Sequence, residues 1–185
     1  MSKLPGFDRV ANQLANAGWP VSLRATGGDV TPQGPGIVNV SHVYATPAEL
    51  SLNIDDEYDA LCAPIEKALG PGASRGWQPG AFCDGAHNVQ LDGLKFAGTA
   101  MRIKRCRPVP KRKAVLAHAL MLMHPPEPAA IKALNTFLSA LAEPRMIDPN
   151  AHTGLPHKTD QQTFLRRLSA EFAALPRLER LEMLN

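Results

Sequence analysis

Hydrophobic and polar positions alternate with two different periods along this chain, which predicts both helices and strands. Apolar residues recur at helical spacing over four segments, 7–17, 56–69, 129–141 and 159–174. Strand-like patterns occupy five others, 19–24, 37–44, 87–91, 94–103 and 114–123. Asp92-Gly93, between two of these strands, is a strong signal for a tight hairpin. We therefore expect an α+β fold in which helices pack on a mixed, largely antiparallel sheet.

The composition is that of a globular protein. Of the 185 residues, 44% are hydrophobic, which allows a real core and argues against disorder. The net charge of +3 does not by itself indicate a nucleic-acid partner. The three cysteines are too few and too irregularly spaced for a disulfide framework, which favours a reducing compartment. No apolar run approaches the roughly 20 residues that cross a bilayer, and the first residues lack the apolar core of a signal peptide. We expect a soluble, cytoplasmic protein without a membrane partner.

Two chemically reactive residues stand among glycines between positions 80 and 100. Cys83 carries a thiol, a better nucleophile than a hydroxyl near neutral pH and one that exchanges readily with thioesters. Lys95 begins a strand and could bind a carbonyl or phosphate oxygen as a cation, and Gly98 would let a ligand lie against that strand. His87 could serve Cys83 as a base if the loop folds back. Structural alternatives exist for both: a half-buried small hydrophobe for Cys83 and an outward-facing charge for Lys95. Together the two residues point to acyl-group chemistry.

Other candidate features are less specific. Arg24 precedes Gly27-Gly28, whose backbone amides could face an oxyanion or simply form a turn. His118 lies in an apolar run and fits a core histidine, and the histidines lack cysteine companions at zinc spacing, so we expect no metal site.

Seven basic side chains gather between positions 102 and 113. They form either a solvated loop or a docking patch for an acidic carrier protein or phosphates. They are Arg102, Lys104, Arg105, Arg107, Lys111, Arg112 and Lys113. No aromatic residue separates them, which makes single-stranded nucleic acid an unlikely partner.

The segments around Arg24 and Lys95 resemble two motifs of the lipoate–protein ligase A and octanoyltransferase family. Residues 24–28 (Arg-Ala-Thr-Gly-Gly) resemble its Arg-Arg-x-Ser/Thr-Gly-Gly motif. Residues 92–100 (Asp-Gly-Leu-Lys-Phe-Ala-Gly-Thr-Ala) resemble its more specific Gly-(Arg/Lys)-Lys-(Ile/Phe)-Ala-Gly-(Ser/Thr)-Ala motif. The resemblance implies the fold shared by biotin and lipoate ligases and class II aminoacyl-tRNA synthetases. It also implies a catalytic domain over 1–142, followed by an irregular segment and a helix over 143–185.

The resemblance further implies roles for the matching residues. Cys83 would be the nucleophile, as in the octanoyltransferase and amidotransferase branches, and Lys95 would hold the acyl carbonyl; these are the expected catalytic residues. The loop at 24–28 would line a tunnel for the acyl chain. The expected substrate-binding residues lie in the two motifs and are Arg24, Thr26, Gly27, Gly28, Gly98 and Thr99.

The implied activity is transfer of a lipoyl or octanoyl group to a lysine of an acceptor lipoyl domain. Two chemistries stay open: ligation that uses ATP and Mg, or transfer through a Cys83 acyl-enzyme from an acyl carrier protein or a lipoyl carrier. A non-catalytic module that binds acyl chains or lipoyl domains is the alternative function. Two departures from the family stand out. Pro32-Gln33 replaces a histidine found in one branch. Only residues 1–23 precede Arg24, where family members usually have a longer segment, so we expect a catalytic domain incomplete at its N-terminus.

Overall fold

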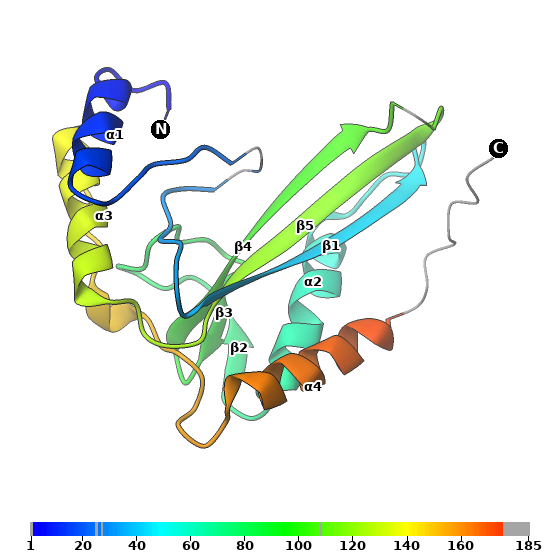
Figure 1. Cartoon of the computed structure of the whole chain (residues 1–185). Coiled ribbons are helices and arrows are strands. Elements are labelled where there is room, and N and C mark those ends of the chain that lie inside the picture. Colours follow the sequence, from blue (N-terminus) through cyan, green and yellow to red (C-terminus); the bar gives the residue numbers. More distant parts are fainter. Residues whose placement is uncertain (1, 25, 27, 108, 176–185) are drawn as a thin grey trace.

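The structure, a computed structural model, describes residues 2–24, 26, 28–107 and 109–175. Within these residues five strands form a sheet in the order β1-β5-β4-β3-β2, and every neighbouring pair is antiparallel. The strands are β1 (Ile37–Pro47), β2 (Ala73–Arg75), β3 (Val89–Leu91), β4 (Leu94–Arg105) and β5 (Arg112–Leu122). The helices are α1 (Phe7–Asn16), α2 (Ile54–Leu69), α3 (Pro128–Ala140), the short η1 (Pro149–Ala151) and α4 (Gln161–Ala173) (Figure 1). The α+β fold with an antiparallel sheet is confirmed.

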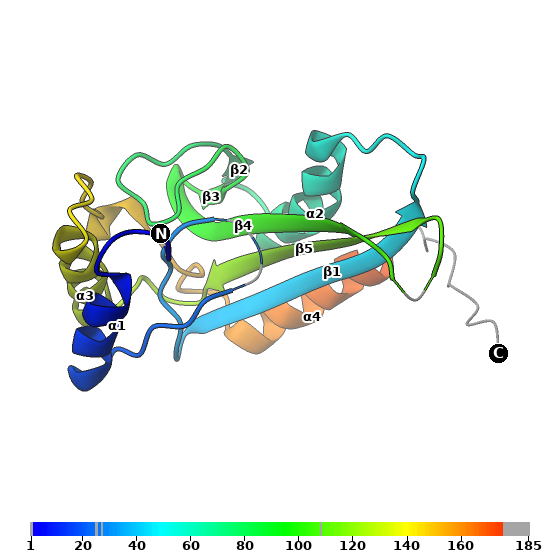
Figure 2. The same ribbon diagram turned by 90° about the horizontal axis from the view of Figure 1, so that it is seen from above.

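Helices cover the two faces of the sheet in pairs. Successive side chains of a strand point to opposite faces. Along β5, Ala117, Ala119 and Met121 accordingly enter the core cluster beneath α2 and α4, whereas Leu120 and Leu122 pack with α3. Helix α1 packs against α3 through the edge-to-face pair of Phe7 and Phe137, whose centroids are 5.8 Å apart. Figures 1 and 2 both show α1 and α3 side by side at one end of the sheet.

Local sequence signals explain where several elements begin and end. The Asn53 side chain accepts a hydrogen bond from the Asp55 amide at the start of α2, and Asp160 does the same for the Thr163 amide at the start of α4. Between β3 and β4, Asp92 and Gly93 have φ angles of 50° and 77°. A tight hairpin turn needs positive φ at both central positions, and the predicted hairpin is confirmed.

One predicted strand is wrong. Residues 19–24 belong to no strand, although their pattern is strand-like. A strand needs a neighbour with which to exchange backbone hydrogen bonds, and β1, the edge strand of the sheet, pairs only with β5 among the described residues. Strand β2 was not predicted, because three residues are too few to show the alternation of apolar and polar positions that marks a strand. Between α3 and α4 the chain is irregular, as predicted for the segment after residue 142, except for the short helix η1.

Helix α4 shares the core of the sheet. Phe164 and Leu168 from this helix lie in the same buried cluster as Leu61 and Ile65 of α2. The proposed division of the chain at residue 142 therefore separates sequence segments that pack together. No helix among the described residues is both long enough and apolar enough to span a membrane.

Candidate active site

Cys83 lies in the loop between β2 and β3 with its sulfur held as a hydrogen-bond acceptor. Its residue is 8% exposed, and its φ of 45° is unusual for a residue other than glycine. The Asp29 amide donates to the Cys83 Sγ at 3.1 Å, and Arg24 Nη2 lies 3.7 Å from the same atom. Two segments far apart in sequence thus meet at the sulfur.

Lys95 is fully buried, so it is not an outward-facing charge. Its Nζ donates to the carbonyl oxygens of Phe82 at 2.6 Å and of Cys83 at 2.8 Å. Burial lowers the pKa of Lys95 to about 8, against an opposing effect of Cys83 and Asp84. An ammonium has three N–H donors and a neutral amine has two donors and a lone pair. The two carbonyls therefore leave one position on Nζ for a ligand in either protonation state.

Gly98 and Thr99 support this arrangement from β4. A Cβ atom at residue 98 would lie 3.1 Å from Lys95 Nζ, so the glycine makes room for the lysine side chain. The Lys95 side chain lies in the space beside Gly98, and contact of a ligand with Gly98 stays a prediction. The Thr99 hydroxyl donates to the His87 carbonyl at 2.8 Å and fixes the far end of the Cys83 loop.

Arg24 and Gly28 bring the N-terminal loop onto the cysteine. Arg24 donates to the Thr31 hydroxyl and to the Asp29 carbonyl, each at 2.8 Å. Gly28 has a φ of 96°, and a Cβ atom there would lie 2.5 Å from Arg24 Nη2 and 3.0 Å from Cys83 Sγ. Only glycine fits this approach. Thr26 lies 3.1 Å from His118 through Oγ1 and Nε2. Gly27 lies outside the described residues.

Two hollows meet at Gly28, which lines both. The larger is a groove of about 910 Å³. Arg24, Thr26 and His118 contribute polar groups to it, and its apolar lining comes from residues that include Val21, Val30, Leu134 and Phe137. His118 is therefore a groove residue rather than the core histidine that its apolar surroundings predicted. The smaller hollow, of about 190 Å³, is lined by Cys83, Thr99 and residues 84–88.

The His87 ring has its partners on α2 rather than at Cys83. Its ring stacks on that of Tyr58, with centroids 3.9 Å apart and planes inclined by 8°. Its Nε2 lies 3.5 Å from an Asp55 carboxylate oxygen. These contacts do not support the proposed role of His87 as a base for Cys83.

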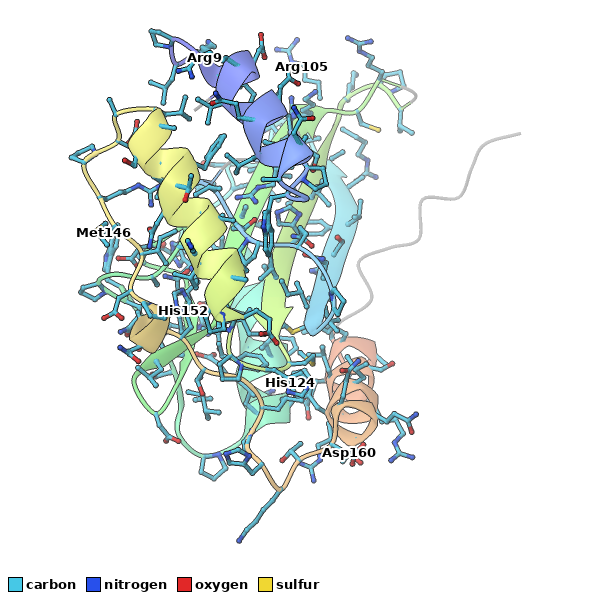
Figure 3. All side chains as sticks on the ribbon, turned by 60° about the vertical axis from the view of Figure 1, so that its left-hand side comes forward. Arg9, Arg105, His124, Met146, His152 and Asp160 are labelled. Carbon is cyan, nitrogen blue, oxygen red and sulfur yellow. The ribbon has the colours of Figure 1, made fainter. Side chains whose placement is uncertain are left out.

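Sequence reasoning missed His152, which is 4% exposed. Its Nε2 accepts a hydrogen bond from the Phe82 amide at 3.1 Å, and its ring stacks on the Phe82 ring with centroids 4.5 Å apart. Figure 3 labels it beside η1. Nothing in its spacing from Cys83 or Lys95 marks it, because only the fold brings the segment after α3 back to this loop.

The basic residues between 102 and 113 lie at the facing ends of β4 and β5 and in the connection between them, and none of them is part of the groove lining. Their role as a docking patch stays a prediction. Across the described ranges, no three or more histidine, cysteine, aspartate or glutamate side chains gather where they could hold a metal ion.

Comparison with known proteins finds a matching family model and two similar sequences. The family model of the lipoyl protein ligase A/B catalytic domain matches residues 9–143. An octanoyl-[GcvH]:protein N-octanoyltransferase of Kyrpidia tusciae is 35% identical over 147 residues, which cover 75% of this chain and 49% of the relative. An uncharacterized protein of Cupriavidus necator is 37% identical over 148 residues, which cover 73% of this chain and 58% of the relative. The chain spans about half the length of the curated relatives it matches.

A solved structure supports the fold. The crystal structure of lipoate-protein ligase A bound with ATP superimposes with a TM-score of 0.61 and 16% sequence identity, over 88% of this chain and 61% of that one. The fold expected from the sequence motifs is confirmed.

Proposed function

The chain belongs to the lipoyl protein ligase A/B catalytic-domain family, and from that premise we propose that it transfers an octanoyl group between proteins through a Cys83 thioester. The similarity to an octanoyl-[GcvH]:protein N-octanoyltransferase favours octanoylated GcvH as the donor. The acceptor in this proposal is a lysine of another lipoyl domain. A lipoyl group is the alternative cargo, since the acyl-binding requirements are similar.

The observation that carries the proposal is the setting of Cys83. Its sulfur accepts a hydrogen bond from the Asp29 amide, and its own carbonyl accepts one from Lys95. A buried lysine of lowered pKa next to a fixed thiol is the pairing that acyl transfer by nucleophilic catalysis needs. ATP-dependent ligation would leave the Cys83 thiol without a role, although Lys95 could then bind a phosphate oxygen.

In the first half-reaction the Cys83 thiolate attacks the carbonyl carbon of the octanoyl-lysine amide. In this proposal the remaining N–H of the Lys95 ammonium binds the oxygen on which negative charge develops. When the C–N bond breaks, Lys95 gives its proton to the departing lysine amine, and octanoyl-Cys83 remains. Because Lys95 must be protonated and its pKa is about 8, this half-reaction slows as the pH rises above about 8.

In the second half-reaction the acceptor lysine amine attacks the thioester carbonyl. Its proton passes to the neutral Lys95, the C–S bond breaks, and the Cys83 thiolate is restored. One amide is exchanged for another, so the overall reaction needs no nucleotide to drive it.

The groove of about 910 Å³ provides a place for the octanoyl chain, because it reaches Arg24 and Gly28 beside the sulfur. At about 0.8 kcal/mol for each buried methylene, an eight-carbon chain gains several kcal/mol there. Arg24, Thr26 and Gly28 are the residues that we propose for the head of this site.

The test is to mix the purified chain with octanoylated GcvH without ATP and to follow the intact mass. We expect an octanoyl adduct that Cys83→Ser abolishes and that Cys106→Ser, a matched change at a partly exposed cysteine, leaves in place. Lys95→Met should slow adduct formation at least about 100-fold, since it removes both acid and oxyanion donor.

Three outcomes would contradict the proposal: an adduct in Cys83→Ser, transfer that requires ATP, or unchanged rates in Lys95→Met. Strong binding of octanoate without turnover of any donor would instead favour a non-catalytic module.

A further inference from the structure

A segment beyond the matched family domain lies across the Cys83 loop. We name residues 147–155 the strap. The Asp148 amide donates to the Gly80 carbonyl at 2.8 Å, the Thr153 amide to the Lys95 carbonyl at 2.9 Å and the Leu155 amide to the Met123 carbonyl at 3.1 Å. The strap is thus fixed to the loop, to β4 and to the end of β5, and Figure 3 shows it descending from α3 past His152.

Gly154 shows how closely the strap packs against the backbone of His124. A Cβ atom at this residue would lie 2.5 Å from the His124 Cα and 2.8 Å from the His124 carbonyl carbon. Backbone atoms cannot yield to such an approach, so only glycine is compatible with this path. Ile147 at the other end is buried, and its amide and carbonyl both bond to the Asn135 side chain of α3.

His152 holds Phe82, the residue directly before Cys83, in two ways. Its Nε2 accepts the Phe82 amide hydrogen at 3.1 Å, and its ring lies against the Phe82 ring, inclined by 17°. Lys95 holds the same residue by its carbonyl, and its Nζ lies 4.9 Å from the centre of the Phe82 ring. Phe82 is therefore bound at its amide, its carbonyl and its ring.

These contacts of Phe82 are important because the next residue, Cys83, adopts a φ of 45°. A side-chain-bearing residue keeps such a conformation only when its surroundings impose it. Lys95 imposes this conformation by its bonds to the carbonyls of Phe82 and Cys83. His152 adds a bond to the Phe82 amide, so the backbone before and after the Phe82–Cys83 bond is held.

The protonation state of His152 agrees with an acceptor role. Burial lowers the pKa of His152 to about 4, and the neighbouring Lys95 cation lowers it further, against a weaker opposite effect of Asp148 and the nearby backbone carbonyls. These are the charged groups that face the ring from β4 and from the strap. The neutral ring offers the lone pair that the Phe82 amide needs.

We propose that His152 is a positioning residue that fixes the Phe82–Cys83 backbone and so aims the Cys83 thiol at its acyl substrate. The functional site then includes a segment that begins after residue 143, where the family match ends. This inference rests on the proposed function, in which Cys83 is the nucleophile.

The experiment compares two substitutions that keep different parts of the histidine. His152→Phe keeps a ring against Phe82 but has no acceptor, whereas His152→Gln keeps an acceptor near the position of Nε2. His157→Phe is the matched control, since His157 is exposed two residues beyond the strap. Each variant is measured by NMR hydrogen exchange at the Phe82 amide, by its thermal unfolding midpoint and by single-turnover acylation of Cys83 from octanoylated GcvH.

We expect His152→Phe to speed exchange at Phe82 about ten-fold or more relative to core amides, because a lost buried hydrogen bond exposes its donor to opening. Acylation should slow about ten-fold at saturating donor, with little change in the donor concentration that gives half the maximal rate. His152→Gln should recover most of both losses, and His157→Phe should show neither.

Unchanged exchange at Phe82 in His152→Phe would overturn the inference. So would equal losses of acylation in His152→Phe and His152→Gln that simply follow their unfolding midpoints, since that pattern marks a purely structural role. Failure of the proposed function is distinguishable, because it shows as no acylation of Cys83 in the unaltered chain. Normal acylation by both the unaltered chain and His152→Phe would overturn the inference about His152 alone.

Discussion

Cys83 stands in a conformation that costs of order 1 kcal/mol or more for a residue with a side chain, and its neighbours define that conformation. Gly28 approaches its sulfur, Lys95 binds its carbonyl, and His152 binds the residue before it. Each contact places a different demand on residue type: no side chain at 28, a long cation at 95, an acceptor at 152. The conformation of Cys83 therefore depends on residues far apart in the sequence.

Gly28→Ala tests the closest of these contacts. The added methyl group would lie 2.5 Å from Arg24 Nη2 and 3.0 Å from Cys83 Sγ, at a φ of 96° that alanine disfavours. We expect Arg24 to be displaced and acylation of Cys83 to fall at least about ten-fold, with about 1 kcal/mol or more lost from the free energy of unfolding. Urea unfolding and intact-mass kinetics measure both.

Gly85→Ala, in the Cys83 loop itself, is the matched control. A Cβ atom at residue 85 meets nothing within 4 Å, and its φ lies outside the left-handed region. Its free energy of unfolding should equal that of the unaltered chain. Equal destabilisation by the two substitutions would show that alanine is tolerated no better where a Cβ atom meets nothing, and the argument from contact at Gly28 would fail.

At the scale of elements, α4 is part of the core that supports the site. It packs on α2, and its Phe164 meets Phe96 of β4 edge to face with centroids 5.6 Å apart. Phe96 directly follows Lys95 and points to the opposite face of the strand. Two adjacent residues of β4 thus serve opposite faces of the sheet: Phe96 packs in the core with α4, and Lys95 lies on the side of the candidate site.

Phe164→Ala should destabilise the whole sheet rather than α4 alone. Removing a fully buried phenylalanine costs about 3–5 kcal/mol. We expect one cooperative urea transition, monitored by far-ultraviolet circular dichroism, with a lower midpoint and a free energy of unfolding reduced by that amount. Arg167→Ala, at an exposed position of the same helix, should leave the midpoint in place. A separate early transition of α4 would contradict a shared core and support the division at residue 142.

At the scale of the whole molecule, buried histidines link stability to pH. Burial lowers the pKa of His152 from 6.5 to about 4, and it lowers the pKa values of His42 and His118 as well. Between pH 6.5 and 4 the unfolded chain binds a proton at His152 that the folded protein does not. The free energy of unfolding therefore falls as the pH falls through this window and gains nothing further from His152 above pH 6.5.

Urea unfolding from pH 7 to pH 4 measures this dependence. For His152 the shift corresponds to roughly 3 kcal/mol at 1.36 kcal/mol for each pKa unit. The free energy of unfolding lost between pH 7 and pH 4 should be smaller by about that amount in His152→Gln than in the unaltered chain. In His157→Gln this loss should equal that of the unaltered chain. Parallel curves for the unaltered chain and His152→Gln would show that His152 does not carry the pH dependence.

The sequence by itself determined the elements whose signals are local. The Asp92-Gly93 turn, the apolar run of β5 and the periodicity of α1 and α3 each depend on residues close together, and each is confirmed within a few positions. The two motifs also identified the family, because they combine rare residue types at fixed spacing.

Only the tertiary structure decided how these pieces meet. Residues 19–24 have a strand pattern but found no partner, since pairing depends on the rest of the sheet. Lys95 follows a polar turn and reads as exposed, yet it is buried because Gly98 makes room for it and two carbonyls receive its hydrogens. His152 carries no local signal at all, because its contact with Phe82 spans 70 positions. Hydrogen bonds and burial between distant segments are properties of the folded chain, whereas turn geometry and periodicity are properties of neighbouring residues.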